Sequence, residues 1–237
     1  MLEGEAGFYH AYAGNNRGEL RYSFTGDNRT DLATITHRLG RHWRFLETLY
    51  RIYSTAGYNI AHVELTARLC DEHKIQYDDI DRIEALVNWF ETEYPSPLFP
   101  TPGSDGRPQV GSTQYFTAWG AVKRGYPLLR GAAPGPGESD PPEVLELMQR
   151  VTLIPVVRRT LFCPRITIFT KDGRSFTKEG TGREFIWDLE EHARRIGPVG
   201  SAAGIGDTQF VYLVDACRRL EALDGAAHTL ISLTIPQ

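Results

Sequence analysis

The chain reads NIAHVELTARLCDEHK from Asn59 to Lys74 and DIDRIEALVNW from Asp79 to Trp89. In the first segment, apolar residues recur three and four positions apart, which is the spacing of one helix face. These residues are Ile60, Val63, Ala67 and Cys70, with Leu65 and Leu69 widening the stripe. Asn59 is of a type that caps helices. In the second segment Ile83, Ala85 and Val87 alternate with polar residues, although Ile80 and Leu86 break the alternation. We therefore predict a helix that is followed by a strand.

Further helix and strand signals follow along the chain. The predicted elements are helices at Gly111–Arg124 and Glu143–Arg150 and β-branched strands at Val151–Arg158 and Arg165–Thr170. The pair Asp172-Gly173 comes directly after the second strand and predicts a hairpin. We expect a type I′ turn there, because that turn needs residues that tolerate positive φ.

The C-terminal part of the chain predicts helices. An amphipathic helix is expected at Arg183–Arg195, ending near Gly197-Pro198, and Gly197–Gly206 is expected to be a linker. From Thr208 the pattern is helical again, with an interruption at Asp224-Gly225. The sum is an α+β fold with a small, mostly antiparallel sheet and packed helices, flanked by helical segments. We expect three regions, 1–49, 50–196 and 197–237, with the sheet in the second.

The composition is that of an ordinary globular protein, with 237 residues, 41% hydrophobic and 24% charged. The formal net charge of -4 gives no basic footprint, so we expect no nucleic-acid partner. No apolar run approaches the ~20 residues that span a bilayer, and the N-terminus carries no secretion signal. Cys70, Cys163 and Cys217 lie far apart, which argues against a disulfide framework and a structural zinc site. A cytoplasmic location follows as the expectation.

Four stretches, in this order and spacing, resemble the C-terminal half of the MmgE/PrpD family of 2-methylcitrate dehydratases and cis-aconitate decarboxylases. They are LGRHWRFLETLYRIYST at Leu39–Thr55, VGSTQYFTAWGAVKRGY at Val110–Tyr126, CPRITIFTKDGRSFTKEG at Cys163–Gly180 and FVYLVDACRRLEALDGAAHTLISL at Phe210–Leu233. Two further matches, at Leu2–Gly14 and His73–Asn88, extend the resemblance over nearly the whole chain, and the order and spacing of all six carry it. The resemblance implies that region 50–196 is an α+β lid domain, between a remnant and the last helices of an all-helical domain.

The resemblance also implies a chemistry. Family members act on di- and tricarboxylates without metal or organic cofactor, by removing a proton next to a carboxylate before dehydration, decarboxylation or isomerisation. Such a reaction needs cationic groups for the carboxylates and positioned proton-transfer groups. The candidate carboxylate-binding residues are Arg51 and Arg41, with Arg44 beside them, and Trp119 is a further substrate-binding candidate. The catalytic candidates are His62, Tyr53 and Tyr58.

Several positions depart from the family pattern. The lysine at the lid entry is replaced by Arg51, which keeps the charge but is a poor proton shuttle. The histidine that follows in several members is absent from 54–60, and His62 replaces it only if the loop is shifted. The family tyrosine falls near Trp119, which has no hydroxyl. Each candidate also has a structural alternative: Arg51 and Arg41 as surface arginines, and His62, Tyr53, Tyr58 and Trp119 as packing residues.

Three hypotheses follow. The chain is the C-terminal, lid-bearing subunit of a split lyase whose helical domain, expected before Met1, is a separate partner subunit. Alternatively, it is a non-catalytic partner or acid-binding subunit that stabilises a catalytic paralogue, since Arg51 and Trp119 stand where the family has a lysine and a tyrosine. The third is a self-sufficient homodimer with a new site built on His62 and the tyrosines.

Overall fold

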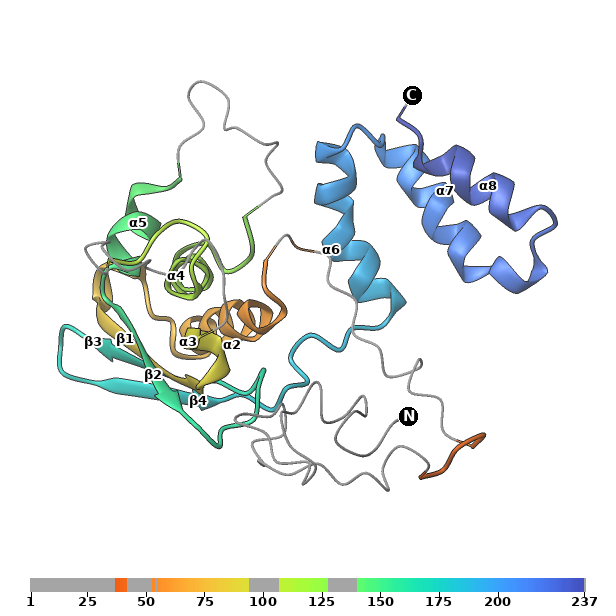
Figure 1. Cartoon of the computed structure of the whole chain (residues 1–237). Coiled ribbons are helices and arrows are strands. Elements are labelled where there is room, and N and C mark those ends of the chain that lie inside the picture. Colours follow the sequence, from red (N-terminus) through yellow and green to blue (C-terminus); the bar gives the residue numbers. More distant parts are fainter. Residues whose placement is uncertain (1–36, 42–52, 54, 94–106, 128–139, 237) are drawn as a thin grey trace. The chain divides into compact units, whose positions relative to one another are not determined.

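The computed structural model describes residues 37–41, 53, 55–93, 107–127 and 140–236. The described chain forms two compact units. The sheet unit holds 37–41, 55–93, 107–126 and 140–185, and the helical unit holds Tyr53, Pro127 and 186–236. Figure 1 shows a small sheet with helices on it in the first unit and a group of helices in the second. The fold class is α+β.

The sheet unit contains both helices and strands. In order they are α2 (Gly57–His73), a 3-10 turn (Tyr77–Asp79), β1 (Ile80–Asn88), α3 (Phe90–Glu93), α4 (Thr113–Lys123), α5 (Pro142–Met148), β2 (Val151–Val156), β3 (Arg165–Thr170) and β4 (Ser175–Glu179). Each matches an element predicted from the sequence to within a few residues, except α3 and the 3-10 turn. The Leu2–Gly14 stretch of the resemblance lies outside the described residues.

Helix α2 is the central helix of the sheet unit. Ten consecutive residues, Tyr58–Ala67, are buried, so the helix is covered on every side over this stretch. The predicted cap is wrong: Ala56 occupies the N-cap position and Asn59 lies inside the first turn. The C-terminus ends with Lys74 in the left-handed conformation and Ile75 N–H donating to Cys70 O at 2.9 Å. That pair of features is a Schellman motif, which satisfies the last carbonyls of the helix.

The sheet has the strand order β2-β1-β3-β4. Strand β1 pairs parallel with β2 and antiparallel with β3, and β3 pairs antiparallel with β4, so two of the three pairings are antiparallel. The β1–β3 register shifts between Ile80 and Arg82. This bulge returns Ile80 to the buried face that Ile83, Ala85 and Val87 also occupy, which explains why the sequence alternation breaks there.

The predicted hairpin forms, but its turn type differs from the prediction. Gly173 has φ of +87°, whereas Asp172 has no positive φ. Thr170 N–H donates to Arg174 O at 2.9 Å, and Gly173 N–H donates to Thr170 O at 2.9 Å. The loop therefore has three residues, with Gly173 at the left-handed position of a G1-type bulge. A type I′ turn is wrong because the loop is one residue longer than that turn allows.

Helices α2 and α4 lie on one face of the sheet, and α5 packs against α4 (Figure 1). Their shared core contains Val63, Leu69, Ile83, Trp119, Leu147, Ile166 and Ile168, among others. The two central helices approach each other at Gly120, where a Cβ would lie 2.6 Å from Val63 O. Only a residue without a side chain allows this approach, so Gly120 fixes the distance between α2 and α4.

The helical unit consists of α6 (Leu189–Ala202), α7 (Asp207–Arg218), a 3-10 turn (Leu220–Ala222) and α8 (Ala226–Thr234). The prediction that the first of these helices ends near Gly197-Pro198 is wrong, because α6 continues through both residues to Ala202. A Cβ at Gly200 would lie 3.4 Å from the ring of Phe210 on α7. The small residues let α7 approach α6, and this packing outweighs the poor helix propensity of glycine and proline.

Two arginines of α6 hold one carboxylate. Glu191 accepts hydrogen bonds from Arg194 at 2.6 and 2.8 Å and from Arg195 at 2.6 Å. The hydrogen bonds from Arg194, and then those from Arg195, lower the pKa of Glu191 from 4.5 to about 2. A carboxylate with a lowered pKa stabilises the folded state above the unfolded pKa, and this contribution is lost as the pH falls through the folded pKa.

We therefore expect the destabilisation caused by Glu191→Gln to be constant above about pH 5 and to shrink as the pH falls towards about 2. Urea unfolding of both proteins across this pH range measures the difference in unfolding free energy. A difference that stays unchanged down to the lowest pH would show that the two arginines do not hold the ionised carboxylate.

Candidate functional site

His62 is the predicted catalytic residue with the best-defined surroundings. It lies on α2 with no exposed surface, and it joins three helices. Its Nδ1 lies 3.1 Å from Thr117 Oγ1 on α4, and its Nε2 lies 3.1 Å from Glu91 Oε2 on α3. Glu91 is also fully buried. Both ring nitrogens therefore have partners inside the protein, and none is left for a substrate in this arrangement.

The hydrogen bonds define how many protons this group holds. While Thr117 Oγ1 donates to Thr113 O at 2.7 Å, it can only accept from His62, and in this arrangement Nδ1 is the donor. A second proton lies between Nε2 and Glu91, because an N–H donates to a carboxylate or a carboxylic acid donates to the nitrogen. In either case the His62–Glu91 pair carries no net charge. Such a pair can be buried at far lower cost than a lone charge.

The pair lies among buried polar atoms that have no hydrogen-bond partner. These include Glu91 Oε1, Asn59 Oδ1 and Thr66 Oγ1. Asn59, His62 and Thr66 are three and four residues apart and so lie along one side of α2. An unpaired Glu91 Oε1 makes the hydrogen bond to His62 the main compensation for burying this side chain. The pair acts as a buried connection between α2, α3 and α4.

The other predicted site residues that the structure describes lie in different surroundings. Tyr58 and Trp119 are buried, at 5% and 8% exposure, and Trp119 packs against Tyr115 with ring centroids 5.6 Å apart. Tyr53 belongs to the helical unit, where its ring meets Trp187 edge-on at 6.4 Å. Arg41 is exposed in a turn. Arg51 and Arg44 lie outside the described residues, so their assignment as carboxylate-binding residues stays a prediction.

Sequence reasoning missed Glu91 and Thr117. Glu91 follows β1 in a short helix that has no clear pattern, and Thr117 lies on a helix whose apolar residues drew attention to Tyr115 and Trp119. No spacing rule connects positions that are 29 and 55 residues from His62. The weak signal was the polarity itself, since a threonine in an otherwise apolar helix needs a partner when it is buried.

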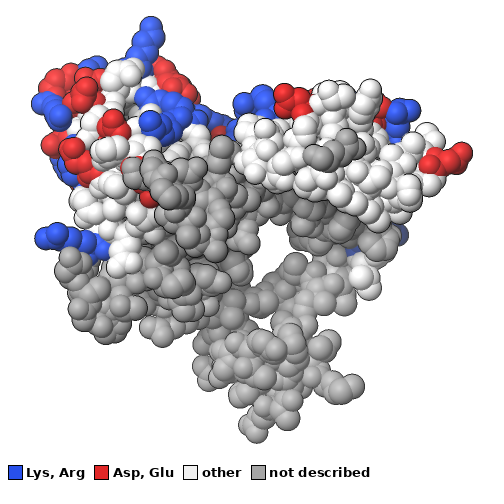
Figure 2. Space-filling view, turned by 90° about the horizontal axis from the view of Figure 1, so that it is seen from above, with Lys and Arg blue, Asp and Glu red and all other residues white. Residues whose placement is uncertain are grey.

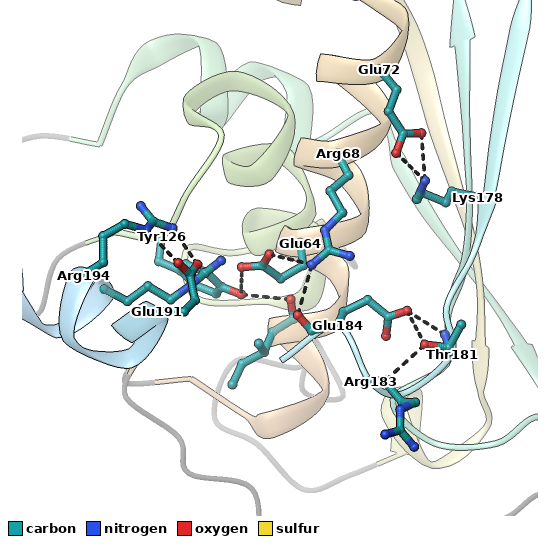
Figure 3. A network of polar contacts seen from close by, with 12 residues as sticks. Glu64, Arg68, Glu72, Tyr126, Lys178, Thr181, Arg183, Glu184, Glu191 and Arg194 are labelled. Carbon is teal, nitrogen blue, oxygen red and sulfur yellow. Dashed lines mark hydrogen bonds and ion pairs between the residues drawn. The ribbon is translucent and has the colours of Figure 1, made fainter. Parts of the chain in front are cut away.

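A second polar network lies further along α2 (Figure 3). Tyr126 Oη lies 3.1 Å from Glu64 Oε1 and 3.0 Å from Ile60 O, and Arg68 is 3.6 Å from Glu64 Oε2. Arg68 also donates to Glu184 O at 3.3 Å. Glu64 and Glu184 are both buried. These contacts hold the segments after α4 and after β4 on α2, and Arg68 contacts both Glu64 and Glu184.

Glu184 has a local role at the end of the β4 segment. Its Oε1 accepts from Thr181 N–H at 2.7 Å and from Thr181 Oγ1 at 2.8 Å. Its Oε2 is buried and has no partner. The bond from Thr181 N–H to the Glu184 side chain is one half of a capping box, which makes structural stabilisation the function that its geometry supports.

The three thiols differ in their surroundings, and none is in a disulfide. Burial raises the pKa of Cys70 to about 11 and also raises the pKa of Cys163. Cys217 is exposed on α7. Since the thiolate is the reactive form, we expect iodoacetamide at about pH 8 to alkylate Cys217 first and to leave Cys70 unmodified in the folded protein. Mass spectrometry of peptides measures the order; early alkylation of Cys70 would contradict the burial of α2.

The described residues lack two kinds of feature. No group of three or more His, Cys, Asp or Glu side chains there is arranged to hold a metal ion. Within the same residues, none of the helices has both the length and the apolar character needed to cross a membrane.

Comparison with known proteins adds no assignment. No family model matches the chain, and no curated protein matches it either.

Proposed function

We propose that this chain is a lid-like subunit of a heteromeric, cofactor-independent lyase of the MmgE/PrpD type. In this proposal it binds a di- or tricarboxylate together with a helical-domain partner. The partner supplies the groups that abstract a proton next to a carboxylate, and the outcome is dehydration, decarboxylation or isomerisation. The support comes from the sequence resemblance and from the burial of the acid/base candidates in the sheet unit.

The burial of His62 is the observation that assigns acid/base chemistry to the partner and substrate binding to this chain. Both of its nitrogens have internal partners, and Tyr58 and Trp119 are core residues. A general base must lie within hydrogen-bond distance of the proton that it removes, and a fully buried, doubly bonded imidazole cannot do so without a rearrangement of α3 or α4. Acid/base chemistry is therefore assigned to the partner, and substrate binding at Arg51 to this chain.

A second candidate function is a subunit that stabilises a catalytic paralogue and does not contact the substrate. The same burial favours it, because a chain that uses its histidine and tyrosines for packing needs no active site. The two functions differ in what Arg51 does. In the first it binds a carboxylate in the shared site, and in the second it does not.

Co-expression with neighbouring genes, followed by native mass spectrometry and turnover assays with 2-methylcitrate and cis-aconitate, tests the proposal. Arg51→Ala in the isolated complex should reduce kcat/KM by ~2 kcal/mol of transition-state binding, about thirtyfold. Arg158→Ala, at an exposed arginine with no assigned role, is the matched control and should leave turnover unchanged. An active complex that tolerates Arg51→Ala supports the stabilising subunit, and turnover by this chain alone contradicts both functions.

A further inference from the structure

Two Asp-Gly pairs lie among the described residues, and such pairs are where a backbone most readily rearranges without an enzyme. They are Asp172-Gly173, between β3 and β4, and Asp224-Gly225, directly before α8. Glycine has no side chain to keep its backbone nitrogen away from the preceding carboxyl group. Acidic side chains lie on the surface of the described chain (Figure 2), and both of these pairs are exposed.

The two pairs share the geometry of their glycines. Gly173 has φ of +87° and Gly225 has φ of +67°, so both lie in the left-handed region. A Cβ at either position would meet no atom within 4 Å. Crowding and glycine conformation therefore do not distinguish the pairs, and a difference in reactivity must come from the contacts of the carboxylate and of the glycine N–H.

Asp172-Gly173 is held at both of the groups that would have to react. Asp172 Oδ1 accepts from Thr170 Oγ1 at 2.6 Å and from Arg174 N–H at 3.3 Å, and Asp172 Oδ2 accepts from Arg174 Nε at 2.6 Å. Gly173 N–H donates to Thr170 O at 2.9 Å. The hydrogen bond from Thr170, and then those from Arg174, lower the pKa of Asp172. A bond between the carboxyl group and this nitrogen therefore requires the hairpin loop to open.

Asp224-Gly225 lacks these restraints. Within the part of the chain that the structure describes, the Asp224 carboxylate has no hydrogen bond or ion pair, and Gly225 N–H donates to no backbone carbonyl. Gly225 is the N-cap residue of α8, and no side chain caps this helix. The first N–H groups of a helix have no partner inside it, so a reaction at the Gly225 nitrogen breaks no hydrogen bond of α8.

We propose that Asp224-Gly225 is a site of spontaneous aspartate isomerisation in the folded chain, whereas Asp172-Gly173 is protected by its contacts. The backbone nitrogen of Gly225 forms a bond to Cγ of Asp224 and gives up its proton, and the side-chain hydroxyl group leaves with a proton as water. The product is a cyclic succinimide. Water then adds to one of its two carbonyl groups. Opening at the main-chain carbonyl gives isoaspartate, and opening at the other carbonyl restores aspartate.

The isomer changes the chain directly before α8. In isoaspartate the backbone runs through Cβ and Cγ, so it gains one methylene group, and a carboxylate is left on Cα. Gln209 on α7 donates to Leu233 O at 3.0 Å and to Ile235 O at 2.7 Å, at the other end of α8. We expect the change to be confined to the α7–α8 loop, because these bonds are distant from it along the helix. The inference is independent of the proposed function.

Incubation of the full chain at neutral pH, folded and in concentrated urea, tests the proposal. Peptide mapping by liquid chromatography and mass spectrometry measures isoaspartate at each pair, because the isomeric peptides separate although their masses are equal. In urea the two pairs should isomerise at rates within about threefold of each other, since their folded contacts are lost. In the folded chain the rate at Asp224 should stay within about fivefold of its value in urea, and the rate at Asp172 should fall at least about 20-fold.

Two variants separate the pairs. Asp224→Glu keeps the charge, but its longer side chain disfavours ring closure, so no isomer should form at this position. Thr170→Val removes a hydroxyl that holds Asp172 and should raise the folded-state rate at Asp172 by at least about threefold. Far-UV circular dichroism and the urea midpoint establish that both variants fold. Equal folded-state rates at the two pairs, isoaspartate at position 224 only in urea, or an unchanged rate at Asp172 in Thr170→Val would overturn the proposal.

Discussion

Glu91→Ala is expected to lower the free energy of unfolding by about 4 kcal/mol, the cost of breaking a buried hydrogen-bonded pair. Removing the carboxyl group leaves His62 Nε2 fully buried without its partner at 3.1 Å. It also leaves a cavity beside α3, and α3 loses its connection to α2. Urea unfolding of the two proteins, with the slope compared as well as the midpoint, gives the difference in unfolding free energy.

Matched variants separate the hydrogen bond from the loss of volume. Glu91→Gln has nearly the same shape and retains a group that can bond to Nε2, so it should cost about 1 kcal/mol. The double variant His62→Leu/Glu91→Leu replaces both polar partners by apolar groups and should be less destabilised than the sum of the single changes by at least about 2 kcal/mol. Additive single changes, or a Glu91→Ala protein as stable as the parent, would show that the pair does not join α2 and α3.

Gly120→Ala is expected to destabilise the chain by about 3 kcal/mol, at the upper end of the cost of overpacking a core. This reverses the usual effect, because alanine is normally favoured over glycine inside a helix by about 1 kcal/mol. A Cβ at this position would lie 2.6 Å from Val63 O and 3.0 Å from Val63 Cα. The contact is with backbone, so one of the two helices must move away from the other.

Gly125→Ala is the control for this prediction. Gly125 lies in the same unit. A Cβ at this position would lie 3.9 Å from its nearest neighbour, Lys123 O, which is an ordinary contact. We expect a change of less than about 0.5 kcal/mol there. Thermal and urea unfolding of both variants give the comparison. A Gly120→Ala protein at least as stable as the parent would mean that α2 and α4 are further apart than described.

The sequence predicted the helices and strands of the sheet unit better than it predicted the turn type and the end of α6. The helical spacing from Ile60 to Cys70 and the alternation from Ile83 to Val87 both led to correct elements, because each repeats the period of its own backbone. Asp172-Gly173 located the hairpin, but the choice between a two- and a three-residue loop depends on strand register, which local sequence does not contain. Gly197-Pro198 was misleading because packing of α7 against α6 outweighs local propensity.

The candidate site was harder to predict for a different reason. His62 was selected for its chemistry, but its partners come from two distant segments and bring it into the core. A polar residue within a ten-residue buried stretch has a structural role when both of its hydrogen-bonding groups are satisfied, and only the tertiary fold reveals this. The predicted roles of Arg51, Arg41, Tyr53, Tyr58 and Trp119 in substrate binding and catalysis remain predictions.

Turnover of 2-methylcitrate and cis-aconitate by this chain alone, and by its complex with a co-expressed helical partner, is the most direct test of the proposed function. The proposed lid-like subunit has no activity alone, and the complex is active and loses about thirtyfold in kcat/KM with Arg51→Ala. Activity of the chain alone that disappears with His62→Gln would contradict the account, since it would require the buried histidine to reach a substrate.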